Sequence, residues 1–314
     1  MQYLVTGGAG FIGSHLTQAL SEHGHSVTVI DDLSTGHRDN VPEGVTFIEG
    51  DCGDAALIPP LLAKADGVFH LAAIASVQRS REDWAETSRV NQFATIKLLD
   101  AIKHSGRKTP FVYASSAAVY GDPDASQYPL TEATPTAPLT PYGVDKLGSE
   151  WHADVARTLF GIPTLGLRFF NVFGPRQDPS SPYSGVISIF VNRIARGEAV
   201  TIFGDGQQTR DFIYVGDVVK ALAAAMQQLE AGNQPPHRAL NICTGVHTSV
   251  QQLAEQVATI CQTTPQITNA AAREGDIRTS VGNPTAMQQY LGVTGTTAFR
   301  DGLQQTIAWA TTAT

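Results

Sequence analysis

The segment around residue 142 contains a tyrosine and a lysine four positions apart, Tyr142-Gly-Val-Asp-Lys146. If the segment is helical, the phenol and the ammonium lie on one face of the helix, one turn apart. A positive charge near a phenol favours the phenolate and lowers the pKa of the tyrosine, which suits acid–base catalysis near neutral pH. A pair this short also arises by chance in amphipathic helices. It therefore indicates a candidate base, which needs support from other residues.

Two serines, Ser115 and Ser116, directly follow an expected buried strand, residues 111–114. Ligands of an open α/β sheet bind at the carboxyl ends of its strands, so a hydroxyl there can hydrogen-bond the substrate oxygen that loses its proton. The alternative is a pair of ordinary turn serines. Their occurrence in one chain with Tyr142 and Lys146 is more specific than either feature, and it makes Ser116, Tyr142 and Lys146 the candidate catalytic residues.

A glycine-rich turn occupies residues 5–13, with glycines at GxxGxxG spacing between an expected strand and an expected helix. Gly7 permits a tight turn, Gly10 lets the backbone approach a pyrophosphate, and Gly13 lets the helix pack close to the sheet. The helix N-terminus offers free N–H groups and the positive end of its dipole to phosphates. A glycine turn that only closes a βα connection is the alternative.

Two acids favour a dinucleotide at that turn. Asp31 ends the second expected strand, at the spacing where an acid receives the hydroxyls of the adenosine ribose. A carboxylate there repels a 2′-phosphate, so NAD is expected as the cofactor in preference to NADP. Asp51 follows the third expected strand and is placed to meet the adenine edge, although a lone acid in this position is more often a turn residue or helix cap.

Short apolar runs alternate with helical patterns along the first half of the chain, which predicts βαβ units. The expected fold class is α/β, a Rossmann-type doubly wound parallel sheet with helices on both faces. After about residue 171 the loops lengthen and the strands shorten. We therefore expect residues 1–170 to form the NAD-binding Rossmann domain, with 211–244 returning to it. Residues 171–210 and 245–314 are expected to form a smaller α/β region that binds the substrate.

The composition is that of a globular protein, with 42% hydrophobic and 16% charged residues. A net charge of −8 argues against binding nucleic acid or an anionic membrane through bulk electrostatics. Three cysteines without CxxC spacing suggest neither a metal site nor a disulfide framework, so a cytoplasmic location is expected. No apolar run is long enough to span a bilayer, and no secretory signal pattern opens the chain.

These motifs together resemble the extended short-chain dehydrogenases/reductases, and within that group the UDP-sugar 4-epimerases. The resemblance implies NAD as cofactor and a UDP-sugar as substrate. It also implies a homodimer, formed through the helices near residues 84–104 and 141–160. The matching motifs run the whole length of the chain: Thr6–Gly13, His70–Ala73, Asn91, Ser115–Gly121, Tyr142-x3-Lys146, Arg168–Gly174, Thr209–Val215 and Arg273-x-Gly-Asp276.

The same resemblance implies a cofactor site in which Tyr142 is also the catalytic base, Lys146 holds the nicotinamide ribose and Ser116 assists the base. The implied cofactor-binding residues are Gly7, Gly10, Phe11, Ile12, Gly13, Asp31, Asp51, Cys52, Leu71, Ala72, Ala73, Asn91, Tyr142 and Lys146.

The implied substrate site combines residues from both halves of the chain. Two arginines can neutralise a diphosphate in an otherwise acidic protein, although each arginine alone more often forms a surface ion pair. The implied substrate-binding residues are Ser116, Asn171 at the diphosphate, Thr201 and Phe203 at uracil, Arg210 and Arg273 at the phosphates, Asp276 at the uridine ribose and Ser280 at the sugar.

The residues after Ser116 indicate which reaction to expect. Relatives that dehydrate or decarboxylate a sugar carry acids where this chain has Ala117 and Ala118, so no group is expected to protonate a leaving hydroxyl. This leaves epimerisation at C4 of a UDP-hexose through a 4-keto sugar, with Tyr142 taking the C4 hydroxyl proton. A small residue at Ser280 implies that UDP-N-acetylhexosamines also fit beside UDP-glucose and UDP-galactose.

Two alternatives remain open. One is a UDP-uronic acid 4-epimerase or another NAD-dependent sugar-nucleotide epimerase, because a fold alone does not determine the substrate. The other is a non-catalytic NAD-binding regulator, against which the intact Ser116, Tyr142 and Lys146 argue.

Overall fold

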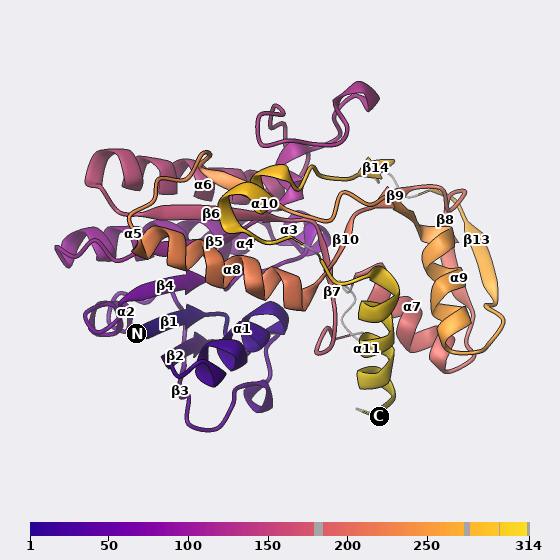
Figure 1. Cartoon of the computed structure of the whole chain (residues 1–314), viewed down its shortest axis with the longest axis horizontal. Helices are drawn as coiled ribbons and strands as arrows, with labels where there is room; N and C mark the ends of the chain where they lie inside the picture. The colour runs from indigo at the N-terminus through magenta and orange to yellow at the C-terminus, as the bar shows by residue number, and fades with distance from the viewer. Residues whose placement is uncertain (179–184, 273–276, 295, 313–314) are drawn as a thin grey trace.

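The computed structural model describes residues 1–178, 185–272, 277–294 and 296–312. Its centre is a seven-stranded, wholly parallel sheet with the strand order β11-β6-β5-β4-β1-β2-β3 (Figure 1). The strand order reverses between β1 and β4, and this is where ligands bind in doubly wound sheets. The expected Rossmann-type α/β fold is confirmed. The strands are β1 (Gln2–Thr6), β2 (Ser26–Asp31), β3 (Thr46–Glu49), β4 (Gly67–His70), β5 (Phe111–Ser116), β6 (Thr164–Phe169) and β11 (Ala239–Ile242).

Helices cover both faces of this sheet, because neighbouring residues of a strand point to opposite sides. Val5 of β1 is buried in the core beneath one set of helices, and its neighbour Leu4 is buried in the core beneath the other. The first set is α1 (Phe11–Glu22), α8 (Val215–Glu230) and α10 (Thr285–Leu291); the second is α2 (Ile58–Leu62), α5 (Ala94–His104) and α6 (Pro141–Phe160).

Helix α6 begins where the sequence predicts it. The hydroxyl of Thr140 accepts a hydrogen bond from the N–H of Gly143 at 3.2 Å, and Pro141 occupies the first turn, where a missing N–H does no harm. The helix ends at Gly161, whose φ of +66° is the left-handed conformation that glycine adopts readily. These two ends place Tyr142 and Lys146 in the first two turns of the helix.

A further core lies beside the sheet and is built around Phe173 and Phe212. Helices α7, α9 and α11 lie together in this part of the molecule, with strands β8 and β13 at its edge (right side of Figure 1). Its elements are β7 (Asn171–Phe173), α7 (Val186–Ala195), β8 (Val200–Phe203), β9 (Thr209–Arg210), β10 (Phe212–Tyr214), β12 (Thr248–Ser249), α9 (Val250–Ile260), β13 (Ile267–Ala270), β14 (Thr279–Ser280) and α11 (Phe299–Thr312).

Helix α10 departs from the division expected from the sequence. It falls within residues 245–314, yet Met287 and Leu291, one turn apart, are buried in the core of the main sheet beside α8 and β11. Residues 215–242, by contrast, return to the sheet as α8 and β11. Helix α11 then crosses back, and its Leu303 and Ile307 are buried in the other core.

Between β4 and β5 the chain forms a series of short helical segments. Its members are α3 (Val77–Glu82), α4 (Trp84–Ser88) and a π-helical turn (Arg89–Phe93) that leads into α5. No helix in the described ranges is long and apolar enough to cross a membrane.

Candidate active site

A cavity of about 510 Å³ opens at the carboxyl edge of the main sheet, where the strand order reverses. Segments that follow β1 to β6 line it, and α6 adds Tyr142 and Lys146 from one side. The structure thus brings together residues that are far apart in the chain. The sequence-predicted residues that line this cavity are Gly7, Gly10, Phe11, Ile12, Gly13, Asp31, Asp51, Cys52, Leu71, Ala72, Ala73, Ser116, Tyr142 and Lys146.

The glycine turn has the geometry that a bound pyrophosphate needs. Gly7 has a φ of +71°, and a Cβ on it would lie 2.6 Å from the amide nitrogen of Ala72. A Cβ on Gly13 would lie only 2.0 Å from the carbonyl oxygen of Gly7, so glycine is required for α1 to approach the turn. A Cβ on Gly10 would come no closer than 3.3 Å to another protein atom. This contact is tight but far less severe than the one at Gly13, and close approach of a pyrophosphate is a further reason for glycine at Gly10.

The carboxylate of Asp31 is buried at the end of β2 and accepts hydrogen bonds from the amides of Ala9 and Leu33, both at 2.9 Å. Burial raises the pKa of this group, and its contacts with the amides of Leu33, Ala9 and Gly10 act in the opposite direction. Asp31 lines the cavity, and a carboxylate can accept further hydrogen bonds there, which fits a ribose diol. The amides at the start of α1 and this carboxylate together fit NAD.

Asp51 is held by a partner that the sequence did not reveal. Its carboxylate accepts from Arg89 at 2.6 Å and from the amide of Gly53 at 2.7 Å, and Arg89 also binds Glu86. These contacts join the loop after β3 to the helices after β4 across one end of the cavity. The neighbouring thiol of Cys52 is buried, which raises its pKa to about 12, so it stays protonated at neutral pH.

Asn91 is not among the residues that line the cavity. It is buried in the π-helical turn, where its Oδ1 accepts from the amide of Ile74 at 2.8 Å and its Nδ2 donates to the Ile74 carbonyl at 3.2 Å. Its amide group thus binds the loop that carries Leu71 and Ala73. In this structure Asn91 shapes the wall of the cavity from behind.

Ser116, Tyr142 and Lys146 come together as the sequence predicts, but the pKa of the phenol differs from the expectation. Burial raises the pKa of Tyr142, and its hydrogen bond with Ser116 offsets this only in part. The Lys146 ammonium donates to the carbonyl of Ala114 at 3.0 Å and lies 5.8 Å from the centroid of the tyrosine ring. The expected lowering of the phenol pKa by lysine is therefore wrong for this structure, in which burial raises that pKa and the group that lowers it is Ser116.

Lys146 is itself strongly perturbed. Burial lowers the pKa of its ammonium to about 8, and the nearby carboxylate of Asp145 opposes that shift. Next to it, burial and the charge of Lys146 lower the pKa of His70 to about 3, so this imidazole is neutral. Neutral His70 bridges Thr6 of β1 and Thr95 of α5, at 2.7 and 3.0 Å.

Among the described residues, those expected at the substrate lie outside the lining of this cavity, apart from Ser116. Asn171 on β7 donates its side-chain amide to the carbonyl of Asp211 at 3.2 Å. Arg210 on β9 is paired in register with Ser280 on β14, which is buried. Thr201 and Phe203 lie on β8, in a separate two-stranded sheet with β13. Arg273 and Asp276 lie outside the described residues.

Asp211 connects several of these segments, and the sequence analysis missed its role. It is fully buried and accepts from the amide and hydroxyl of Thr244, at 2.8 and 2.7 Å, and from the amide of Gly245 at 2.8 Å. Its own amide donates to the carbonyl of Ser280 at 2.8 Å. Asp211 directly follows Arg210 within the motif Thr209–Val215, and this position was the feature of the sequence that could have indicated its role.

Comparison with known proteins agrees with this geometry. Residues 3–243 match the model of the NAD dependent epimerase/dehydratase family. The chain is 35% identical to a UDP-glucose 4-epimerase of Mycolicibacterium smegmatis over 313 residues, covering 98% of this chain and 97% of the relative.

Two solved structures are similar over essentially the whole chain. The UDP-glucose 4-epimerase of Thermotoga maritima with UDP-glucose superposes with a TM-score of 0.94 at 34% identity, covering 100% of this chain and 99% of that one. The UDP-glucose 4-epimerase of Thermus thermophilus in complex with NAD gives a TM-score of 0.91 at 34% identity, with both chains covered to 100%. With its glycine turn, strand-end serine and Tyr-x3-Lys helix in one cavity, the chain belongs to the NAD-dependent epimerase/dehydratase family.

Proposed function

We propose that this protein inverts C4 of a UDP-hexose with NAD as cofactor, and that UDP-glucose and UDP-galactose are one substrate pair. The observation that carries the proposal is the contact of Ser116 with Tyr142 beside the glycine-turn cavity. Alanines follow Ser116 at both positions where an acid would promote loss of a sugar hydroxyl. The similarity to UDP-glucose 4-epimerases over the whole chain supports the same reaction.

In this proposal the residues of the cavity hold NAD. The first amides of α1 and the turn at Gly10 bind the pyrophosphate, Asp31 binds the adenosine ribose, and Asp51 meets the adenine edge. When bound, NAD supplies reversible hydride acceptance, so the reaction needs no external oxidant. Lys146 holds the nicotinamide ribose.

Tyr142 performs the proton transfers. Its phenolate oxygen takes the proton of the C4 hydroxyl while Ser116 donates a hydrogen bond, and the resulting 4-keto sugar turns over in the site. Tyr142 then returns the proton to the C4 oxygen on the opposite configuration. Burial raises the pKa of Tyr142, so its action as a base depends on the hydrogen bond with Ser116, which lowers that pKa.

The substrate is proposed to bind across the second core. Asn171 and Arg210 bind the diphosphate, with Arg273 as a second cation, and Thr201 and Phe203 receive the uracil. Asp276 is assigned to the uridine ribose. Holding the diphosphate firmly leaves the sugar few contacts, which permits its rotation between half-reactions.

The finer specificity rests on Ser280. A serine has far less volume than a tyrosine, so we propose that UDP-N-acetylglucosamine and UDP-N-acetylgalactosamine are a second substrate pair. Ser280 is buried beside Arg210 in the present structure. Ser280→Tyr is therefore expected to remove N-acetylhexosamine activity by steric exclusion, and Ser280→Ala, which adds no volume, to retain it.

The protein is further proposed to be a cytoplasmic homodimer. Its cysteines, Cys52, Cys243 and Cys261, are all unpaired, which suits a reducing compartment. Large apolar side chains are exposed on neighbouring helices of one face, and a second copy would cover them. They are Trp84 on α4, Phe93 in the π-helical turn, and Val144, Trp151, Val155 and Leu159 on α6.

The test uses the protein as purified, with no added cofactor. Incubation with UDP-glucose should give UDP-galactose by chromatography, and acid release should yield NAD with little NADP. UDP-N-acetylglucosamine and UDP-glucuronic acid are tested in parallel. Activity on UDP-glucuronic acid alone would replace the proposed substrate, and a protein that binds NAD but converts none of them would support the regulator instead.

A further inference from the structure

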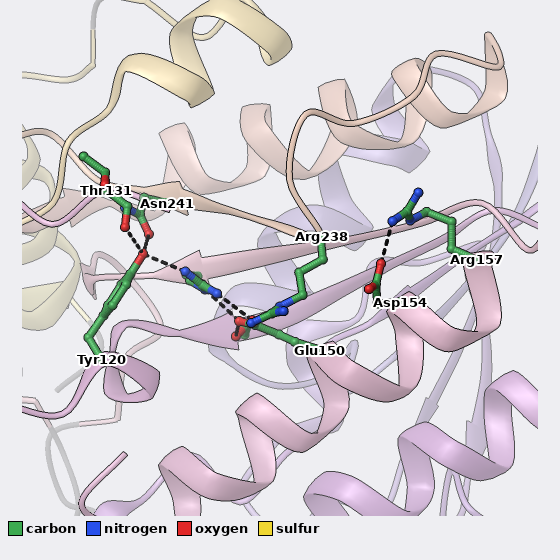
Figure 2. A network of polar contacts seen from close by, with 9 residues as sticks. Tyr120, Thr131, Glu150, Asp154, Arg157, Arg238 and Asn241 are labelled. Carbon is green, nitrogen blue, oxygen red and sulfur yellow. Dashed lines mark hydrogen bonds and ion pairs between the residues drawn. The ribbon is translucent and has the colours of Figure 1, made fainter. Parts of the chain in front are cut away.

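A buried ionic network lies behind the candidate catalytic residues, between α6 and strands β5 and β6 (Figure 2). At its centre Arg168 of β6 forms two hydrogen bonds with Glu150 of α6, Nε to Oε1 at 2.8 Å and Nη2 to Oε2 at 2.7 Å. Glu150 is fully buried and Arg168 is 2% exposed. Arg238 adds a further contact to the carboxylate at 3.3 Å.

This ion pair contacts the segment that carries Ser116 at both of its ends. The hydroxyl of Ser115, the residue before Ser116, donates to Glu150 Oε1 at 2.6 Å. At the other end, Arg168 Nη1 donates to the hydroxyl of Tyr120 at 2.8 Å. Residues 115–120 are thus fixed to one carboxylate–guanidinium pair on both sides of Ser116.

The far side of the network secures Tyr120. Its hydroxyl oxygen lies 2.6 Å from the side-chain oxygen of Asn241 in β11 and 3.0 Å from the carbonyl of Thr131, the two acceptors for its single proton, and Figure 2 shows these contacts converging on the hydroxyl oxygen. Asn241 in turn donates to the carbonyl of Leu130 at 2.9 Å. The hydroxyl of Tyr120 therefore has one position, set by three elements.

Helix α6 meets β5 through polar contacts at successive turns. Tyr142 hydrogen-bonds Ser116, Lys146 donates to the carbonyl of Ala114, and Glu150 accepts from Ser115. Residues at this spacing lie on one face of a helix. The Glu150 contact is therefore the last of three that fix the helix bearing the base against the strand bearing its partner hydroxyl.

Stability alone does not explain this arrangement. Two charges taken from water lose solvation that their attraction repays only with good geometry, and apolar side chains of similar volume often stabilise a protein as well or better. A fully buried pair that contacts the catalytic segment at two points is better explained by the precision it gives to that segment.

We propose that the Glu150–Arg168 pair, acting through Ser115 and Tyr120, positions the Ser116 hydroxyl against the Tyr142 phenol. The four are positioning residues, because none of them is assigned a contact with the substrate. The inference rests on the proposed C4 epimerisation, in which Ser116 assists Tyr142.

The test removes single hydroxyl groups, so that no charge is left unpaired in the core. Ser115→Ala deletes the bond to Glu150, and Tyr120→Phe deletes the bond to Arg168. The matched control is Thr164→Val, because the hydroxyl of Thr164 in β6 also donates to α6, at Ala153 O and 2.9 Å, at the end of the helix remote from Ser116. Ser115→Ala and Thr164→Val each lose one buried hydrogen bond between α6 and the sheet, so Thr164→Val is matched to Ser115→Ala. Tyr120→Phe also loses the contacts of its hydroxyl with Asn241 and Thr131.

We expect Ser115→Ala and Tyr120→Phe each to lower kcat about tenfold, the effect of roughly 1.4 kcal/mol in the barrier, with KM and bound NAD unchanged. Thr164→Val should leave kcat within about twofold. Hydrogen exchange of residues 115–121 should be faster in the two test variants than in the control. Exchange needs no turnover, so it decides the positioning claim even if the epimerase proposal fails with every UDP-sugar.

A double-mutant cycle identifies the route of the effect. If Ser115 acts through Ser116, Ser115→Ala should lower kcat no further in a Ser116→Ala background. Additive losses in kcat would overturn the proposal, because they would mean that Ser115 acts on the reaction independently. Unchanged exchange in residues 115–121, or a loss of kcat in Thr164→Val as large as in the test variants, would overturn it as well.

Discussion

At the scale of single residues, the molecule places a phenol and an ammonium in a buried site, and the two are perturbed in opposite directions. Burial raises the pKa of Tyr142 and lowers that of Lys146 to about 8, so both shifts favour the neutral form. Because the shift disfavours the phenolate, the role of Tyr142 as a base depends on a hydroxyl such as Ser116 that stabilises the phenolate.

Tyr142→Phe tests the base directly. It removes only the phenolic oxygen, so we expect turnover of UDP-glucose to fall by at least about two orders of magnitude while the fold and the bound NAD persist. Turnover is measured by chromatography and NAD by its absorbance after release. The control is Tyr290→Phe, which removes a hydroxyl bonded to the Asn233 carbonyl at 3.0 Å outside the cavity lining. Near-normal turnover in Tyr142→Phe would refute the assignment.

Lys146→Met tests the cost of the buried ammonium. A pKa lowered from 10.5 to about 8 corresponds to about 3 kcal/mol against folding at neutral pH. Loss of the hydrogen bond to the Ala114 carbonyl reduces this gain in stability by about 1 kcal/mol. In urea unfolding at pH 7, NAD-free Lys146→Met should therefore be more stable than the wild type by about 2 kcal/mol, although it is inactive.

The stability difference between Lys146→Met and the wild type should depend on pH. Between pH 8 and 10.5 the unfolded chain binds more protons at Lys146 than the folded chain, so the stability of the wild type rises with pH through this window. The advantage of Lys146→Met should shrink across the same window. A constant difference from pH 7 to 10.5 would show that the lysine is not desolvated as the structure indicates.

At the scale of elements, two glycines of the β1–α1 turn are required for different reasons, Gly13 for packing within the protein and Gly10 for the approach of the cofactor. Gly13→Ala places a Cβ 2.0 Å from the Gly7 carbonyl oxygen, so it should lower the Tm of the NAD-free protein by several degrees. Gly10→Ala brings a Cβ no closer than 3.3 Å to another protein atom, so it should lower that Tm less than Gly13→Ala does, yet weaken NAD binding at least tenfold. Thermal unfolding and NAD titration measure the two effects, and equal Tm losses would contradict the distinction.

Elements with a strong local sequence pattern could be predicted. Elements and contacts that depend on residues far away in the chain could not. The run Leu240–Ile242 predicted β11, and the Pro141 start predicted α6, because burial and capping are local properties. Strands of two residues, such as Thr209–Arg210, contain no period to detect. The role of Arg89 was hidden because its partner Asp51 is 38 positions away.

The candidate site was predictable to a similar degree. Glycines, strand-end residues and the Tyr-x3-Lys pair were found because each motif is contiguous in the chain. The placement of Asn91 behind its loop depends on the side-chain direction in a π-helical turn, which the sequence pattern does not encode. The raised pKa of Tyr142 required knowledge of its burial, whereas the sequence offered only the proximity of Lys146.

At the scale of the whole molecule, the exposed apolar face predicts self-association. Val155 and Leu159 are 48% and 69% exposed and lie one turn apart on α6. Val155→Glu combined with Leu159→Glu should convert the proposed dimer to a monomer, because two carboxylates per copy cannot be buried unpaired in an apolar interface. Light scattering after size exclusion gives the mass, and Val246→Glu, an exposed apolar site elsewhere, is the control. A wild type that is monomeric at micromolar concentration would contradict the dimer.

The chain passes between its two cores more than once, and this limits which fragments of the protein can fold alone. Strand β11 and helices α8 and α10 join the main sheet from residues 215–291, after the chain has already built part of the second core. A fragment of residues 1–170 would leave β6 as an open edge strand with unpaired backbone groups and bare apolar surface, a template for aggregation. Neither core can therefore be released intact by one proteolytic cut between them.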